Sequence, residues 1–498
     1  MPSTAYPLHA GFVVVYLVIL IGVGAVKARS IRSQTDFSLA GRGLSTFVLV
    51  GTLLATWIGT GSIFGNAEET FEVGAAAFLL PASTGVGIVA LYLLAPRIRR
   101  FGEFTIQDIL EARFGVATRV MGTVTLVLAY VIIVSYQYRA GSAVLEYLWP
   151  ELSATAAKCI VALFVIVYTA LAGMYSVAYT DVANGILMTL GVFVALPILY
   201  SQAGGSEGIE RALEPTALDT FGTYTTAQLV SYLLPILLLL LGDANMVQRF
   251  FSAKSPGAAR ASVAGMFVGV LVLEMAIIAV ALLGKALVAG GTIGAPDNSA
   301  HIVLHLAFHA LPPFLGAMMV ATVVAIVVST ADSYLLSPST SLVRDVYSRF
   351  IDKDADEAQL VRAGRTVVIL LGLVALGLAF TSDEFFDIAL FAYTIYGAGI
   401  TPALLAAFFW KRATATGAFT SMVAGVGTSV VWYVCVEQGF LARWAESAGW
   451  TGLAETVTRT ADAEIDAVIP SIVVSVLVLV VVSLRGAPPP PERAEALA

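Results

Sequence analysis

Long runs of apolar residues recur along this chain of 498 residues, and they constrain its fold more than any other feature. A helix of about 20 residues crosses the hydrocarbon core of a bilayer. Runs of roughly that length predict thirteen membrane spans, at 10–27, 45–66, 73–95, 118–146, 156–173, 178–200, 226–247, 262–288, 313–338, 362–380, 386–409, 416–436 and 467–484. We therefore expect an all-α polytopic membrane protein with a single transmembrane domain, residues 1–484.

The overall composition supports lipid as the solvent. The chain is 58% hydrophobic and only 12% charged, whereas soluble domains carry about 25% charged residues. Its net charge is -7 and it has no basic stripe, so we expect no nucleic-acid partner. Cys159 and Cys435 both lie in apolar runs, and two such cysteines form neither a disulfide framework nor a metal site.

The distribution of basic residues predicts the topology. Most of the 27 Lys and Arg residues fall in alternate loops, beginning with the loop after the first span. Because basic loops stay in the cytoplasm, this bias predicts a protein of the cell membrane with its N-terminus outside the cell and its C-terminus in the cytoplasm. The last residues, 485–498, contain a proline run and charged residues, and we expect a disordered cytoplasmic tail.

Ionisable residues inside predicted spans are functional candidates, because hydrocarbon penalises unpaired polar groups. They are Arg139, Asp181, Asp243, Glu274 and Asp332. On a helix, residues three and four apart share a face, so three side chains of the run Ser329–Ser333 join Asp332 in a surface of oxygen donors. Hard cations prefer oxygen ligands, and this surface indicates a sodium site. The alternative is that the hydroxyls only bond to backbone carbonyls.

The second span contains Ala55-Thr56-Trp57-Ile58-Gly59-Thr60-Gly61, followed by Gly65. Three glycines lower helix propensity midway across the membrane. A broken membrane helix exposes carbonyl oxygens that can coordinate a cation. Close helix packing through small residues is the alternative, and glycine spacing alone leaves both open.

Six motifs in order resemble those of the sodium:solute symporter family. They are Asp36–Arg42, Phe101–Gly115, Tyr179–Asp181, Gly242–Phe251, Ser329–Ser333 and Trp410–Gly417. The resemblance implies a LeuT-like fold with two inverted five-helix repeats, at 45–200 and 226–409, one extra N-terminal helix and two extra C-terminal helices. It also implies sodium-coupled symport of a small organic solute by alternating access, with the first helix of each repeat broken near Trp57–Gly61 and Gly242–Asn245.

The same resemblance implies the ion sites. The carbonyls of Ala55, Ile58 and Ile326 and the hydroxyls of Ser329 and Thr330 match the common sodium site of the family. A second cation site, found in some members, would comprise Asp181, Ser329, Asp332 and Ser333. A buried carboxylate at Asp332 could strengthen cation binding, or it could carry a proton instead.

Seven residues are expected to face the solute. They are Trp57, Thr60, Gln137, Asp243, Asn245, Tyr393 and Tyr396. The stretch Thr56–Gly59 followed by Gly65–Glu68 is similar to the choline-transporting branch, and an aromatic face attracts a quaternary ammonium. Asp243 would supply a counter-charge. The alternative is that Trp57 only packs and that Asp243 pairs with Arg249.

Other function classes have less support. A proton-coupled symporter of the same fold and a transporter-like sensor are the alternatives, and no constellation typical of an enzyme is visible. His301, His305 and His309 are spaced for one helix face, but their apolar neighbours favour a surface helix over a transition-metal site. We therefore expect sodium as coupling ion, no cofactor and no obligate protein partner. The expected partners are the small solute, sodium and the bilayer.

Overall fold

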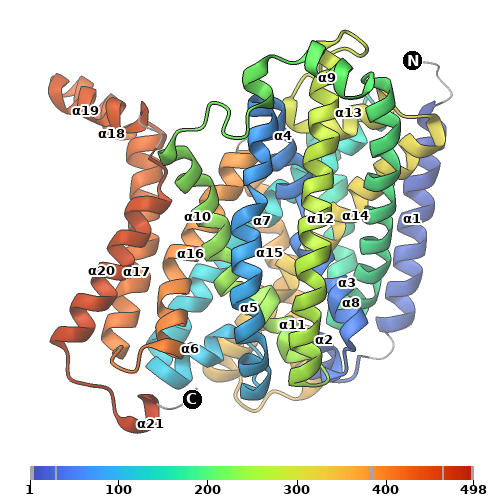
Figure 1. Ribbon diagram of the computed structural model, residues 1–498. Helices are drawn as coiled ribbons and strands as arrows, with labels where there is room; N and C mark the ends of the chain where they lie inside the picture. The colour runs from blue at the N-terminus through green and yellow to red at the C-terminus, as the bar shows by residue number, and fades with distance from the viewer. Residues whose placement is uncertain (1–4, 29–30, 382–384, 463–464, 495–498) are drawn as a thin grey trace.

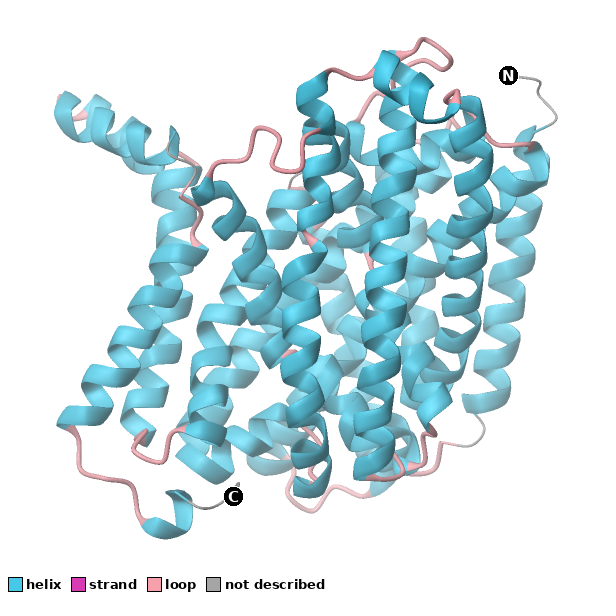
Figure 2. Ribbon diagram, viewed as in Figure 1, coloured by secondary structure: helices cyan, strands magenta, loops and turns pink. Residues whose placement is uncertain are grey.

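The computed structural model describes residues 5–28, 31–381, 385–462 and 465–494. In this part of the chain the secondary structure is helical apart from one isolated bridge, between Leu44 and Ala253 (Figure 2). The helices of the first half are α1 (Ala5–Ala28), α2 (Gln34–Leu39), α3 (Thr46–Trp57), α4 (Asn66–Val73), α5 (Pro81–Phe101), α6 (Ile106–Phe114), α7 (Val116–Leu148), α8 (Ala154–Gln202), α9 (Gly205–Ala212), α10 (Thr226–Gly242) and α11 (Ala244–Ser252).

Those of the second half are α12 (Pro256–Ala289), α13 (Ile302–His309), α14 (Pro313–Ser341), α15 (Glu357–Leu378), α16 (Phe386–Phe409), α17 (Ala415–Trp432), α18 (Phe440–Ser447), α19 (Thr451–Asp462), α20 (Val468–Arg485) and α21 (Pro491–Ala494). Two π-helical segments matter below: η2 (Gly61–Gly65) follows α3, and η6 (Leu342–Ile351) continues α14.

The described helices include eleven that are long and apolar enough to cross a membrane, or twelve if the bent pair formed by α3 and Gly61–Leu79 is one span. This count does not confirm the predicted thirteen. The difference lies in α8, where the two predicted spans 156–173 and 178–200 run on as one element of 49 residues. A straight helix of that length would be about 73 Å long, more than twice the roughly 30 Å of hydrocarbon. Gly173, at φ 58° and ψ 175°, kinks α8 between them.

The predicted breaks are confirmed in both helices. In α3 the helix ends at Trp57, and Ile58 leaves helical geometry with ψ 90°. The chain then bends by 52° before it continues at Gly61. Gly59 is needed there, because a Cβ atom at this position would lie 2.9 Å from Thr330 Oγ1. In the second case α10 ends at Gly242, and the side chain of Asp243 caps α11 by accepting the Met246 N–H at 2.9 Å.

The core of the bundle lies around α14 and α16. In the most apolar parts of Pro313–Ile351 and Phe386–Phe409, 78% and 83% of the residues are buried, against 22% in α1. Figure 1 shows α1 at one edge of the bundle, and α17 and α20 together at the opposite edge. α14 packs against α7 and α8, and α3 packs against α8 and α12. The sequence run Ser329–Ser333 is thereby placed at the centre of the molecule, beside the break of α3.

The two ends of the bundle carry different short elements. α2, α6 and α21 lie at one end in Figure 1, whereas α9, α13, α18 and α19 lie at the other. Part of the segment expected to be a disordered tail forms the short helix α21, which packs against α6. Residues 495–498 of that tail lie outside the described residues.

Candidate functional site

The hydroxyl of Ser329 faces the end of the first half of the broken helix. Its Oγ lies 3.1 Å from the carbonyl oxygen of Ala55 and 3.1 Å from that of Ile326. All three residues are at most 1% exposed. The structure therefore brings together oxygens from α3 and α14 that the sequence predicted to share one sodium ion.

Thr330 completes this group of oxygens. Its Oγ1 is buried and has no hydrogen-bond partner in the part of the chain that the structure describes. The backbone of Gly59 lies directly against it, at the break. A buried hydroxyl without a partner costs about 1–3 kcal/mol, and a cation at the break would satisfy its oxygen. The donors are carbonyl and hydroxyl oxygens, which suit a small hard cation, so the residues present fit sodium.

The predicted second cation site contains a cation of the protein itself. The Arg249 guanidinium donates from Nη2 to Ser333 Oγ at 2.7 Å and forms an ion pair with Asp181 Oδ2 at 3.3 Å. Arg249 Nε also donates to Thr52 Oγ1 at 2.9 Å, and that hydroxyl donates to Asp181 at 2.6 Å. Two of the four predicted ligands thus contact Arg249, and a second cation would compete with its positive charge.

Asp332 has a different partner. Its Oδ1 accepts a hydrogen bond from Thr169 Oγ1, 2.5 Å away on the first half of α8. Ser333 Oγ lies 3.0 Å from the backbone oxygen of Ser329. The hydroxyls of Ser333 and Ser329 therefore both bond to backbone carbonyls, those of Ser329 and Ile326 respectively. This is the alternative to ion binding that the sequence left open.

A cavity of about 40 Å³ lies beside the second half of the broken helix. Of the seven residues predicted to face the solute, Trp57 and Tyr393 line it. The other residues that line it are Gly61, Ser62, Asn66, Leu80, Thr84, Ile236, Leu239, Glu274, Tyr334, Phe386, Ala389 and Leu390. The cavity is therefore lined by aromatic and aliphatic side chains together with the polar groups of Ser62, Asn66, Thr84 and Glu274.

The remaining five predicted solute residues are buried elsewhere. Thr60 donates to the side-chain oxygen of Gln137, and Tyr396 donates to the carbonyl of Gly242 at 2.7 Å. Asp243 caps α11, and its other carboxylate oxygen lies 3.4 Å from the Tyr334 hydroxyl. Arg249 pairs with Asp181 and not, as sequence analysis had considered, with Asp243.

Asn245 is the fifth of them. It is fully buried, and neither of its side-chain polar atoms has a partner among the described residues. The five residues lie at or against the breaks that follow α3 and α10, but they do not line the cavity in this conformation.

Glu274 was recognised as an ionisable residue within a span but was not assigned to the site. It projects from the middle of α12, is 3% exposed and lines the cavity. Its Oε1 accepts the indole N–H of Trp57 at 3.1 Å. The sequence signal was a single carboxylate in a long apolar run. The contact with Trp57, more than 200 positions away, could be found only from the fold.

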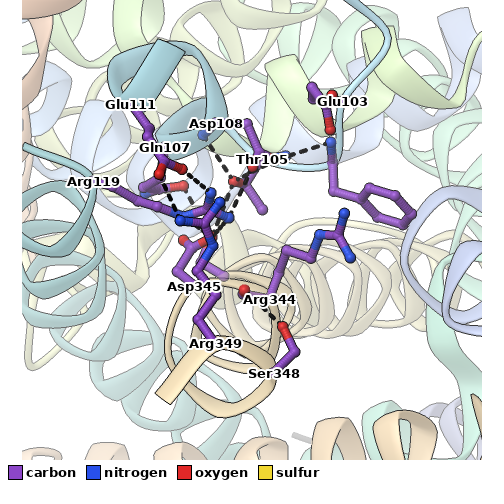
Figure 3. A network of polar contacts seen from close by, with 12 residues as sticks. Glu103, Thr105, Gln107, Asp108, Glu111, Arg119, Arg344, Asp345, Ser348 and Arg349 are labelled. Atoms are coloured by element: carbon purple, nitrogen blue, oxygen red, sulfur yellow. Dashed lines mark hydrogen bonds and ion pairs between the residues drawn. The ribbon is translucent and has the colours of Figure 1, made fainter. Parts of the chain in front are cut away.

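A second buried polar group lies at the end of the bundle that carries α6. This Arg119 cluster consists of Arg119, Asp108, Glu111, Asp345 and Arg349. Figure 3 shows the Arg119 side chain among the carboxylates of Asp108, Glu111 and Asp345. Arg119 pairs with Asp108 at 2.8 Å and also pairs with Glu111 and Asp345, while its side chain is only 1% exposed.

The cluster connects three elements by charge. Arg119 lies on α7, Asp108 and Glu111 on α6, and Asp345 on η6. Burial raises the pKa of the Glu111 carboxyl, but its hydrogen bonds and ion pairs with Arg349 and Arg119 outweigh burial and leave the pKa lowered. The loop Phe101–Gly115 resembles a family motif, but its sequence does not reveal the pairing with residues more than 200 positions away.

Known proteins resemble this chain over most of its length. The model of the sodium:solute symporter family matches residues 37–425. Sodium/proline symporter 2 of Staphylococcus saprophyticus is 24% identical over 468 residues, which cover 87% of this chain and 89% of that protein. The high-affinity proline transporter PutP of Bacillus subtilis is 27% identical over 433 residues, or 83% of this chain and 89% of that protein.

Solved structures confirm the LeuT-like fold. A Na+-coupled sialic acid symporter in a substrate-bound, outward-open state aligns with a TM-score of 0.78 at 17% identity, over 97% of this chain and 98% of that one. MHP1, a nucleobase-cation-symport-1 family transporter, aligns in a closed conformation with a TM-score of 0.57 at 13% identity, over 93% and 97%. The chain is an integral membrane transporter and not an enzyme. It belongs to the sodium:solute symporter family, whose members couple the transport of a small solute to sodium.

Proposed function

We propose that one sodium ion binds at the break of α3, held by the carbonyls of Ala55, Ile58 and Ile326 and by the hydroxyls of Ser329 and Thr330. The observation that supports this most strongly is the partnerless, buried Oγ1 of Thr330 against Gly59. A hydroxyl bonded only to backbone would need no ion, but this oxygen lacks any such bond.

This position explains how sodium could be coupled to movement. Ser329 and Thr330 belong to α14, whereas Ala55 and Ile58 belong to α3. An ion shared between them stabilises only the conformation in which the two helices are in contact. We propose that α3, α5, α10 with α11, and α12 move together against a scaffold that contains α14. Sodium then favours one end state and, by reciprocity, raises the affinity for the solute.

We propose that the solute binds in the cavity that Trp57 and Tyr393 line. Trp57 and Gly61, which lie on either side of the unwound residues 58–60, both line the cavity, so the two proposed sites lie at the same break. Small amino acids are the first class to test, since the relatives described above are named as proline transporters. Choline-like solutes are a second class. Asp243, the expected counter-charge for them, is engaged as a helix cap.

The second cation site remains a less favoured proposal. Asp181 and Ser333 would have to release Arg249 before another cation could bind there. We also propose, from the basic loops, that the N-terminus is outside and the C-terminus is in the cytoplasm. The end with α2, α6 and α21 would then be the cytoplasmic end.

Transport in proteoliposomes tests the sodium site. Purified protein is given labelled proline and, in parallel, a panel of labelled amino acids, with either sodium or potassium outside. We expect uptake of at least one solute to collapse when potassium replaces sodium, and Ser329→Ala to weaken its sodium dependence. Uptake that ignores the exchange but follows a pH gradient would instead select a proton-coupled symporter.

A further inference from the structure

We propose that Glu274 selects the solute, and that its carboxylate accepts a hydrogen bond from an ammonium N–H group. This inference rests on the proposed binding of solute in the central cavity and adds its chemical class. The substrate would be an amine or an amino acid whose nitrogen carries both a positive charge and at least one hydrogen.

The first support is the position of the carboxylate. Glu274 lines the cavity together with Trp57, Tyr393 and Tyr334, and it is 3% exposed. Hydrocarbon and protein interiors tolerate a carboxylate only when it is paired, and such residues in membrane spans usually serve binding or transport. Glu274 belongs neither to the Arg119 cluster nor to the ion pair of Arg249 with Asp181, so those contacts do not explain its presence.

The second support is an oxygen without a partner. Oε1 accepts the Trp57 indole N–H at 3.1 Å, and Thr84 also gives the carboxyl group a side-chain hydrogen bond. Oε2 is buried and has no hydrogen-bond partner among the residues that the structure describes. An unsatisfied oxygen on a charged group is costly, and a ligand that brings a donor removes that cost.

The third support is the charge of the lining. Among the residues around the cavity, Glu274 is the acidic one, and none is Lys or Arg. A solute with a net negative end near Glu274 would be repelled, whereas an ammonium group would be attracted by the carboxylate and by the aromatic rings of Trp57 and Tyr393. Charge and aromatic faces therefore select the same ligand class.

Hydrogen bonding separates two kinds of organic cation. A quaternary ammonium, such as that of choline, is attracted to aromatic faces but has no N–H to donate. A primary or secondary ammonium offers both charge and donor, and such charge-assisted hydrogen bonds are among the strong ones.

Thermal stability of the purified full chain in sodium tests this choice. The probes form matched sets: L-proline with N,N-dimethylproline and cyclopentanecarboxylate, and ethanolamine with choline. We expect stabilisation by proline or ethanolamine, and much less by the quaternary and nitrogen-free partners. In Glu274→Gln the affinity for the N–H ammonium should fall roughly 10- to 100-fold, because the charge-assisted bond is lost.

Two controls separate selection from folding. Glu207→Gln, an exposed carboxylate on α9, should bind the probes as the wild type does. Glu274→Gln should keep its stabilisation by sodium alone, which shows that it folds with an intact ion site. Loss of that sodium response together with solute binding would mark Glu274 as structural and overturn the proposal.

The remaining outcomes also decide. The proposal is overturned if choline, N,N-dimethylproline or cyclopentanecarboxylate binds more tightly than the matched probe that has an N–H group. It is also overturned if Glu274→Gln binds amines as tightly as the wild type, or if no N–H ammonium binds at all. Sodium-driven uptake of a neutral or anionic solute that survives Glu274→Gln refutes this inference but leaves symport intact. Amine uptake that needs Glu274 but ignores sodium refutes the proposed sodium site alone.

Discussion

Two buried polar regions of the molecule differ in how completely they are satisfied by the protein itself. In the Arg119 cluster, each of the carboxylates Asp108, Glu111 and Asp345 is paired with an arginine. Beside the break of α3, Thr330 Oγ1 and Glu274 Oε2 are buried without partners among the described residues. On our proposal, these two oxygens are left free for an ion and a solute, whereas the carboxylates of the Arg119 cluster are satisfied within the fold.

The difference also follows the elements involved. The Arg119 cluster joins α6, α7 and η6, which continues α14, so it fixes the loop after α5 to the helices around α14. The proposed sodium site joins α14 to α3 through an ion that can leave. A transporter needs both kinds of contact, since one part must stay rigid while another is released.

Removing the arginine at the centre of the cluster should have the largest effect. Arg119→Ala leaves the buried carboxylates of Asp108 and Asp345 without an arginine, while Glu111 keeps Arg349. Breaking a buried pair in this way costs about 3–5 kcal/mol. We expect a markedly lower melting temperature that added sodium does not restore.

Arg349→Ala is the matched control. Arg349 forms an ion pair with Glu111 at 2.5 Å, but its side chain is 38% exposed, so its loss should cost about 0–1 kcal/mol. Equal destabilisation by the two variants would show that the cluster is not organised around Arg119.

The next prediction compares two threonines. Thr123 Oγ1 donates to Asp345 at 2.8 Å, whereas Thr330 Oγ1 has no partner in the described structure. Thr123→Val should therefore lower the stability of the sodium-free protein by about 1–3 kcal/mol. Thr330→Val should leave the sodium-free stability unchanged or raised, and should weaken sodium affinity by about tenfold or more, as read from the sodium-dependent thermal shift.

A loss of sodium-free stability in Thr330→Val would contradict the difference between the two regions. If Thr330→Val destabilised the sodium-free protein as Thr123→Val does, its hydroxyl would have a structural partner. The Thr330 oxygen would then not be a ligand held ready for sodium.

A smaller effect is expected at Trp57. Trp57→Phe keeps an aromatic face but removes the N–H that Glu274 Oε1 accepts. One lost hydrogen bond to a charged acceptor predicts about a 10-fold rise in the solute KM, with sodium affinity unchanged. Trp57→Ala should be more damaging, because the aromatic face is lost as well. Unchanged uptake of every organic cation by Trp57→Ala would exclude an aromatic contact with the solute.

Local sequence patterns predicted the parts of this molecule that depend on neighbouring residues. Glycines indicated a weak helix near Ile58 but left close packing open, and the family motifs implied the breaks near Ile58 and Asp243. Both breaks are present. The approach of Ser329 to Ala55 was implied by family motifs, and the structure brings the two within 3.1 Å.

Contacts across long distances in the sequence were not predictable in the same way. Arg249 was considered as an alternative partner of Asp243, six positions away, but it pairs with Asp181 on α8. Glu274 and Trp57 are joined by packing between α12 and α3. The count of thirteen spans divided 156–200 into two helices. The structure has one helix there, α8, with a kink at Gly173.

A high-resolution structure of the protein in sodium, compared with one in potassium, tests the proposed ion site most directly. We predict sodium-specific density among the carbonyls of Ala55, Ile58 and Ile326 and the hydroxyls of Ser329 and Thr330, with Arg249 still bound to Asp181. Density that instead lies between Asp181 and Asp332, with Arg249 displaced and Thr330 uncoordinated, would contradict this assignment.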